Sequence, residues 1–188
     1  MGSVEKITER YLVPIIEDMI RQYPFKILGF HADNGSEYIN KLVAKLLNKF
    51  LIEFTKSRPR KSNDNALVES KNGSIIRKHM GYLFIPQSNA TNIHEFYQSY
   101  LNDYLNFHRP CGFSRDEQDS KGKIKKIYDS YLTPFEKLKT LDNPNQYLKP
   151  NLTMTQLETK SLAHSDTEFA KIMEKEKLKL FKMIGFVF

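Results

Sequence analysis

The order of two short apolar runs around one helical pattern is the feature that most limits the folds open to this chain. Residues 25–30 and 51–55 each have the length and apolar character of a buried strand. Residues 38–50, between them, repeat apolar side chains at three- and four-residue spacing, and residues 4–22 do the same before the first run. The resulting order of helix, strand, helix, strand predicts an α/β fold whose two strands pair in parallel.

The charge of the chain narrows the class of partner. Its 188 residues include 29 Lys and Arg against 22 Asp and Glu, which gives a net charge of +7 and a pI near 9.3. Such a balance favours an anionic partner, with DNA the leading candidate, although a basic protein without that partner would have the same composition. Seven of the cations and only two acids lie between Lys56 and Lys78.

The sequence argues against a membrane-spanning protein and against a protein stabilised by disulfides. No stretch approaches the roughly 18 apolar residues that a spanning helix needs, and no N-terminal signal is visible. We therefore expect a cytoplasmic protein with no membrane partner. The single Cys111 excludes an internal disulfide and a cysteine-based zinc site.

Two carboxylates are the candidate catalytic and metal-binding residues. Asp33 directly follows the first strand run, and Glu69 comes after 35 intervening residues. Ligands of open α/β sheets bind at the carboxyl edge of the strands, and Mg²⁺ prefers carboxylate oxygens. The alternative is that Asp33 is a turn or capping residue and Glu69 a solvated one, with His31 a hydrogen-bonding or packing residue. The residues expected to contact DNA are Lys56, Arg58, Arg60, Lys61, Asn63, Asn65, Lys71, Arg77 and Lys78.

The remaining chain is predicted to be mainly helical. Helices are expected over residues 65–80 and 92–107, and a Thr-Pro pair predicts the start of a short helix over residues 133–138. Residues 113–126 have mixed charge and no periodicity, so a mobile loop or linker is expected there. Two terminal helices are expected over residues 153–163 and 167–184.

Two segments resemble signature blocks of a known superfamily. Residues 31–38, HADNGSEY, and residues 57–69, SRPRKSNDNALVE, are similar to the second and third blocks of the integrase catalytic core, that is, of DDE transposases of the bacterial insertion-sequence type. The separation of Asp33 and Glu69 is also typical of that family. Residues 104–110, YLNFHRP, and residues 133–138, TPFEKL, resemble the C-terminal part of bacterial transposases.

The resemblance implies a fold, an activity and a cofactor. The family fold is ribonuclease H-like, with a five-stranded sheet, and its three carboxylates bind Mg²⁺ or Mn²⁺. The family enzyme joins a DNA 3′-hydroxyl to a target phosphodiester, which is DNA integration or transposition. In this chain Asp33 matches the second acid and Glu69 the third.

The first acid and three of the five strands have no counterpart here. We therefore expect a partial ribonuclease H-like integrase core that retains two parallel strands and is followed by C-terminal helices. The expected regions are a partial catalytic core over residues 4–110, a basic linker with a short helix over 111–150, and a helical region over 151–188. Such a truncated chain would be inactive alone. It could instead complement a separate N-terminal part, or act as a non-catalytic nucleic-acid-binding or interaction module alongside a full-length transposase.

Overall fold

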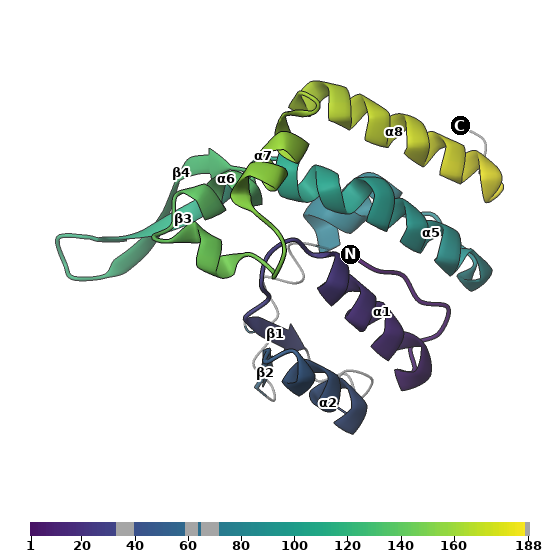
Figure 1. Ribbon diagram of the computed structural model, residues 1–188, viewed down its shortest axis with the longest axis horizontal. Helices are drawn as coiled ribbons and strands as arrows, with labels where there is room; N and C mark the ends of the chain where they lie inside the picture. The colour runs from purple at the N-terminus through teal and green to yellow at the C-terminus, as the bar shows by residue number, and fades with distance from the viewer. Residues whose placement is uncertain (33–39, 59–63, 65–71, 187–188) are drawn as a thin grey trace. The chain divides into compact units, whose positions relative to one another are not determined.

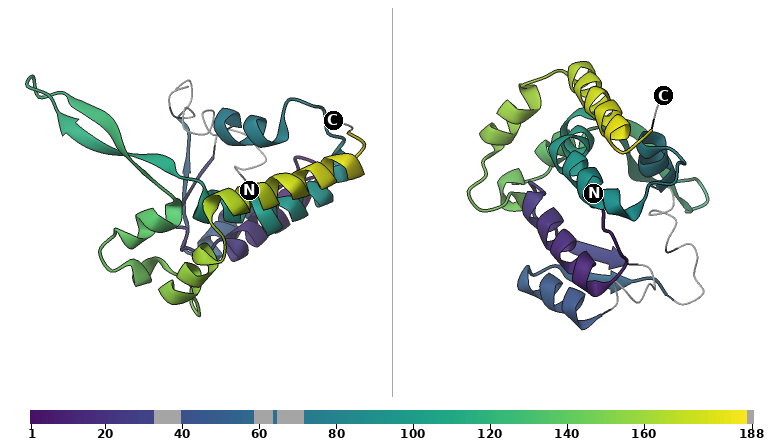
Figure 2. Two further views of the ribbon diagram at one scale, coloured as in Figure 1. Left: turned by 90° about the horizontal axis from the view of Figure 1, so that it is seen from above. Right: turned by 90° about the vertical axis from the view of Figure 1, so that its right-hand side faces the viewer.

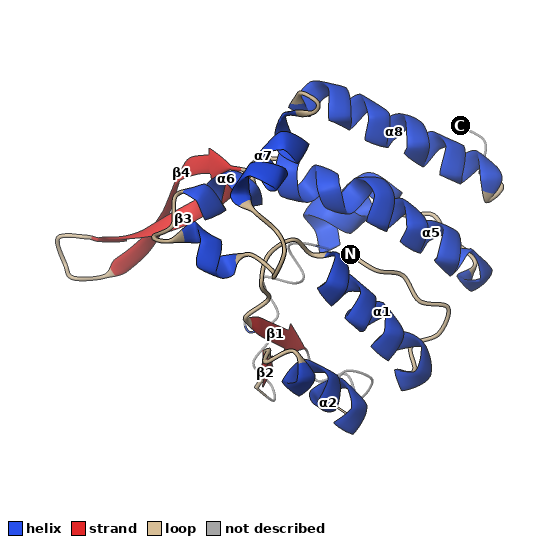
Figure 3. Cartoon of the chain, viewed as in Figure 1, coloured by secondary structure: helices blue, strands red, loops and turns tan. Residues whose placement is uncertain are grey.

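The computed structural model describes residues 1–32, 40–58, 64 and 72–186, and over these residues the chain is a mixed α/β structure with two small sheets (Figures 1 and 3). This confirms the predicted α/β class. The chain divides into two compact units, Gly2–His94 and Met1 together with Glu95–Phe188. Among the described residues, no helix combines the length and apolar character that crossing a membrane requires.

The unit Gly2–His94 contains a strand–helix–strand arrangement preceded by a helix. Its first elements are α1 (Glu9–Gln22), β1 (Gly29–Ala32), α2 (Lys41–Lys49) and β2 (Glu53–Lys56). The strands β1 and β2 form a two-stranded parallel sheet with Gly29 opposite Glu53 and Ala32 opposite Lys56. The predicted parallel pairing is therefore confirmed.

Helices α1 and α2 supply most of the core that covers one face of this sheet. α2 starts at an Asn40 cap, whose side chain accepts a hydrogen bond from the Val43 backbone at 2.8 Å. Phe30 of β1 and Phe54 of β2 pack against the helical core, so the alternate strand side chains point to the opposite face. The buried residues of the core are Leu12, Ile16, Ile20, Val43, Leu46, Leu47 and Ile52.

Two predicted boundaries in this unit differ from the structure. The first helix begins at Glu9, five residues later than the amphipathic pattern indicated. The first strand is Gly29–Ala32 rather than residues 25–30, because the ladder exists only where the four residues of β2 supply a partner. The shift brings His31 and Ala32 into the strand.

The rest of the unit is helical where it is described. A π-type turn, η2 (Asn72–Arg77), leads into the single turn α4 (Lys78–Met80), which Gly81 ends at a φ of +74°. The 3-10 turn η3 (Gln87–Asn89) precedes α5 (Ala90–Phe96). The helix predicted over residues 65–80 is thus present in its described part.

Within Glu95–Phe188, the helix begun by α5 continues as two π-type segments, η4 (Tyr97–Leu101) and η5 (Tyr104–His108). The helix predicted over residues 92–107 is therefore confirmed with modified geometry. The strands β3 (Cys111–Gln118) and β4 (Ile124–Leu132) follow, and the later elements are α6 (Pro134–Lys139), η6 (Pro144–Tyr147), α7 (Met154–Leu162) and α8 (Asp166–Met183).

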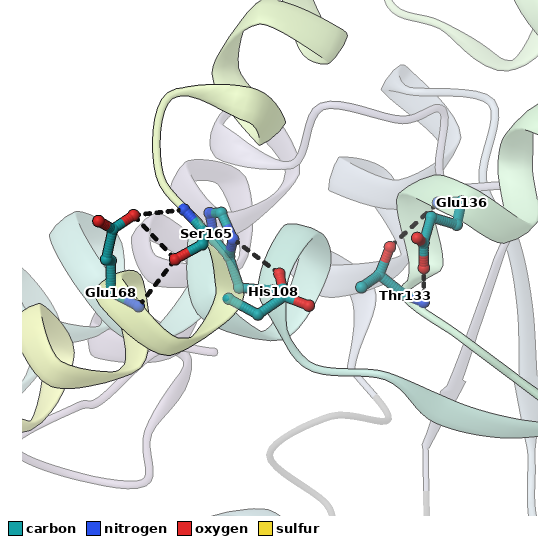
Figure 4. Close-up of polar contacts among 6 residues, drawn as sticks. His108, Thr133, Glu136, Ser165 and Glu168 are labelled. Carbon is teal, nitrogen blue, oxygen red and sulfur yellow. Dashed lines mark hydrogen bonds and ion pairs between the residues drawn. The ribbon is translucent and has the colours of Figure 1, made fainter.

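Locally encoded caps begin each of the last three α-helices. Thr133 and Glu136 form a reciprocal capping box at α6, and Ser165 and Glu168 form another at α8 (Figure 4). α7 has the same arrangement at Thr153. The predicted short helix and both terminal helices are confirmed.

The same unit has an aromatic core to which α8 is attached. The Phe107 and Phe135 rings lie 5.5 Å apart, and Phe135 is almost completely buried. The centroid of the His108 ring lies 4.3 Å from that of Phe169 of α8, and the two rings are stacked. The His108 Nδ1 lies 3.2 Å from the carboxylate of Asp166, a contact drawn as a dashed line from His108 in Figure 4. These contacts join the end of η5 to the start of α8.

The prediction of a loop or linker over residues 113–126 is wrong. These residues belong to an antiparallel hairpin in which β3 and β4 pair from Cys111 opposite Leu132 to Gln118 opposite Ile124. The left view of Figure 2 shows the hairpin extending away from the helices of its own unit. Because both faces of the hairpin are largely exposed, its sequence lacks the apolar alternation that marks a half-buried strand.

Candidate functional site at the carboxyl ends of the parallel strands

A polar cluster occupies the sheet face opposite the core of Gly2–His94. His31 of β1 lies directly across from Thr55 of β2, and its Nδ1 is 2.9 Å from the threonine hydroxyl. Side chains alternate along a strand, so both residues point away from the face covered by Phe30 and Phe54. The pair is a cross-strand contact made possible by the parallel register.

Ser57 extends this cluster one step beyond β2. Its hydroxyl is 3.2 Å from His31 Nε2, and its backbone N–H donates to the Ala32 carbonyl at 3.0 Å. Ser57 is 1% exposed, whereas His31 is exposed. Hydrogen bonds at both ring nitrogens hold the imidazole in one orientation at the carboxyl ends of the two strands. The expectation that His31 is a hydrogen-bonding residue is confirmed.

An ion pair lies close to the cluster. The Arg58 guanidinium donates to both oxygens of Asp64 at 2.9 Å, and the Arg58 backbone N–H adds a third hydrogen bond at 3.0 Å. These hydrogen bonds hold the pKa of the Asp64 carboxyl well below its usual range. Those from the guanidinium have the largest effect, and the one from the backbone N–H comes next. The charge of His31 also acts on Asp64 in the same direction, which places the ion pair within electrostatic reach of the imidazole.

The bidentate pair changes the expected role of Arg58. Two guanidinium nitrogens are already used by Asp64, so Arg58 has fewer donors and less net charge to offer to a phosphate than an unpaired arginine would have. The pair also joins two residues six positions apart in the chain. Arg58 therefore has an evident role in holding the carboxylate of Asp64.

Several predicted site residues lie outside the described part of the chain. They are Asp33, Glu69, Arg60, Lys61, Asn63, Asn65 and Lys71. Asp33 is the residue next in sequence to Ala32, which ends β1. The assignments of Asp33 and Glu69 as catalytic and metal-binding residues remain predictions.

The other predicted DNA-contacting residues are exposed cations. Lys56 ends β2, beside the polar cluster in sequence, and is exposed. Arg77 ends η2 and lies over the Tyr82 ring at 5.6 Å, which is a cation–π distance. Lys78 begins α4 and is exposed. All three can present positive charge to an anion.

The described residues do not by themselves form a metal centre, since they contain no group of three or more His, Cys, Asp or Glu side chains that could hold an ion. Near the strand ends, the described donors are an imidazole and two hydroxyls, and the nearby carboxylate of Asp64 is paired with Arg58. Hard divalent cations prefer carboxylate oxygen. Whether Asp33 and Glu69 add the carboxylates of a metal site stays a prediction from the sequence.

Sequence reasoning did not select Thr55, Ser57 or Asp64. A signal for the first two existed in the sequence, because residues two apart in an extended segment share a face, and Thr55 and Ser57 are two such polar residues. Their contact with His31 depended on the register of β1 against β2, which the sequence did not specify. The Arg58–Asp64 pair joins two residues six positions apart in the chain.

Comparison with known proteins gives one relative of unknown role. No known protein family matches the chain. Over 112 residues, 60% of its length, the chain is 30% identical to y4rM, an uncharacterized protein of Sinorhizobium fredii. The chain spans only 32% of the length of that relative.

Proposed function

We propose that this chain is the C-terminal part of a DDE-type transposase and functions in DNA integration. In this proposal the parallel pair β1–β2 with α2 is the retained part of a ribonuclease H-like integrase core. Asp33 and Glu69 are its second and third acids. None of the 188 residues matches the first acid, so these residues alone do not catalyse strand transfer.

The observation that carries the proposal is the position of the parallel strands relative to the two motifs. The motif with Asp33 begins within β1, and the motif that ends at Glu69 begins immediately after β2. Because β1 and β2 are parallel and in register, both motifs start at the same edge of the sheet. The contact of His31 with Ser57 joins the first residues of the two motifs.

A bound divalent ion would be held by Asp33 and Glu69 and would supply charge stabilisation for phosphoryl transfer. The chain's own residues provide the surroundings. Hydrogen bonds from His31 to Thr55 and Ser57 connect the carboxyl ends of the two strands. Lys56, Arg77 and Lys78 supply exposed positive charge for the DNA backbone.

The comparison with y4rM is compatible with the chain being part of a larger assembly. The matched segment is about a third of that relative, so a similar segment occurs within a longer protein. In the proposal the missing first acid comes from a separate N-terminal part or from a full-length transposase.

Localised cleavage by Fe²⁺ tests whether Asp33 and Glu69 share a metal. Fe²⁺ replaces Mg²⁺, and with ascorbate and peroxide it cuts the backbone next to its binding site. We expect cuts near both Asp33 and Glu69, and none near either residue in Asp33→Asn. Cuts near only one of them, or cuts that Asp33→Asn leaves unchanged, would refute the shared site. Asp116→Asn, on the hairpin, is the matched control.

A strand-transfer assay tests the proposed inactivity. The purified chain, with Mg²⁺ or Mn²⁺, is incubated with a labelled 3′-hydroxyl DNA end and a target duplex. We expect no joined product. Metal-dependent joining that Asp33→Asn abolishes would show that the chain is a complete enzyme.

The second candidate is a non-catalytic DNA-binding module derived from a transposase. The exposed cations Lys56, Arg77 and Lys78 favour it, because their contact with a phosphate backbone needs no bound metal. Salt-dependent DNA binding distinguishes the two. Binding that is unchanged in Asp33→Ala/Glu69→Ala, together with no Fe²⁺ cleavage near either acid, would favour the binding module.

A further inference from the structure

The hairpin formed by β3 and β4 is a long, exposed two-stranded ribbon with a tightly held tip. The Asp119 carboxylate accepts hydrogen bonds from the backbone N–H groups of Lys121 and Lys123 at 2.9 and 3.0 Å. Gly122, with φ of +77°, closes the turn by donating to the Asp119 carbonyl at 2.9 Å. These backbone hydrogen bonds lower the pKa of the Asp119 carboxyl, so the ionised carboxylate stabilises the turn.

Positive charge is concentrated at this tip. Arg115, nearer the base, is held by Asp129 at 2.6 Å and by Glu117 at 2.7 Å. The tip itself has four lysines in six residues, all exposed: Lys121, Lys123, Lys125 and Lys126. Lys125 lies 3.5 Å from Asp119, an exposed and weak contact. Acidic residues offset part of this charge, because Glu117 and Asp116 lie opposite Lys125 and Lys126 in the strand register. Residues 116–126 still carry a net positive charge, with four lysines against Asp116, Glu117 and Asp119.

Exposed apolar side chains continue from the tip along β4. Ile124, Tyr128 and Tyr131 are 65%, 57% and 68% exposed. A Cβ added at Gly112 would lie 3.2 Å from the Tyr128 ring and 3.6 Å from the Tyr131 ring. The glycine thus makes room for two tyrosines beside each other on one face. Exposed apolar surface of this kind is typical of an interaction site.

The charge distribution decides between a second copy and a polyanion as the occupant. Pairing of two such ribbons would bring lysines of both copies together, and lysines on exposed strands are a common means of preventing edge pairing. Double-stranded DNA complements the cationic tip, and its major groove, about 12 Å wide, admits a two-stranded ribbon. Strands of eight and nine residues reach about 27 to 30 Å, enough to enter the groove from a backbone contact.

We propose that the hairpin Cys111–Leu132 binds duplex DNA as a β-ribbon. Ile124 lies toward the base edges in the groove, the tip lysines contact phosphates, and the Tyr128 and Tyr131 hydroxyls contact the backbone nearer the base of the hairpin. The inference rests on the proposed DNA-related function, and it assigns DNA contact to a second element outside the two acidic motifs.

Binding of a fluorescent duplex, measured by anisotropy over a range of salt concentrations, tests the proposal. The variant Lys123→Ala/Lys126→Ala removes two exposed tip charges. We expect it to weaken binding and to reduce the magnitude of the negative slope of log K against log salt by about 1.8, because each phosphate contact contributes about −0.9. Lys171→Ala/Lys175→Ala, which removes two exposed charges from α8, is the matched control and should change the slope much less.

The possible outcomes separate this inference from the proposed function. Equal effects of the two double variants would refute the hairpin as a DNA contact and leave the proposed function intact. Absence of any DNA binding by the unmodified chain would refute both. The variant Tyr128→Ser/Tyr131→Ser tests two other partners, single-stranded DNA and a second copy of the chain. If the variant loses single-stranded but not duplex binding, or if it converts a dimer into a monomer, the duplex assignment is overturned. Circular dichroism confirms that each variant is folded.

Discussion

Replacing Tyr97 by Phe should change how the stability of the chain depends on pH. Tyr97, in η4, is 6% exposed and its ring lies 6.2 Å from that of Phe96. Burial raises the pKa of its phenol from 10.0 to about 12. Because the folded state holds the proton more tightly, the stabilisation is complete below pH 10 and is lost as the pH rises toward 12.

The size of the effect follows from the pKa difference. Each unit corresponds to about 1.4 kcal/mol, so complete ionisation of Tyr97 should destabilise the fold by about 3 kcal/mol. At pH 11 about half of this free energy, roughly 1 to 2 kcal/mol, should already be lost. Tyr97→Phe lacks the ionisable hydroxyl and should not show this loss.

Urea unfolding followed by circular dichroism at pH 8 and pH 11 measures the difference. Groups that titrate in both proteins cancel, so the variant should gain about 1 to 2 kcal/mol relative to the unmodified chain between the two pH values. Tyr128→Phe, at a 57% exposed position, is the control and should follow the unmodified chain. A free-energy difference between Tyr97→Phe and the unmodified chain that is the same at both pH values would refute the reasoning.

Three further predictions concern the core, a helix cap and the ion pair. Leu47→Ala removes a completely buried side chain from the core of Gly2–His94 and should lower the free energy of unfolding by about 2 to 5 kcal/mol; a loss below 1 kcal/mol in urea unfolding would contradict this packing. Thr133→Ala removes the buried cap of α6 and should lower the free energy of unfolding by about 1 to 2 kcal/mol. This loss should exceed that of Thr153→Ala at the more exposed cap of α7, and equal losses in urea unfolding would argue against the role of burial. Arg58→Met should raise the pKa of the Asp64 carboxyl toward its ordinary value, because the two guanidinium hydrogen bonds are lost; a carbon-13 NMR titration in which Asp64 is unchanged would show that Arg58 is not the cause.

Local signals predicted the helices better than the strands. The Thr133-Pro134 pair and the apolar spacing of α2 act within a few residues, so the sequence contains them directly. Strand boundaries depend on a partner, and β1 is displaced from the apolar run because β2 pairs only four residues. The hairpin was missed for a related reason: Arg115 and its acidic neighbours are held by ion pairs across and along the strands, without a buried face that would produce apolar alternation.

The sequence predicted the strands and motifs that make up the candidate site, but not the side-chain contacts within it. The sequence indicated that a strand precedes each of the two acidic motifs, and the parallel register brings the starts of both motifs to one edge. The contacts of His31 with Thr55 and Ser57 join residues more than twenty positions apart, so no local pattern contains them. The Arg58–Asp64 pair joins two charges that sequence reasoning considered only as parts of a basic segment.

The two hydroxyls beside His31 have a consequence for where the ring carries its proton. A hydroxyl can donate or accept by rotating about its C–O bond, so Thr55 and Ser57 can satisfy the ring in either tautomer, and as acceptors they can also satisfy the imidazolium. The imidazole can therefore keep a hydrogen-bond partner at each ring nitrogen, whichever nitrogen carries the proton, without displacement of any heavy atom.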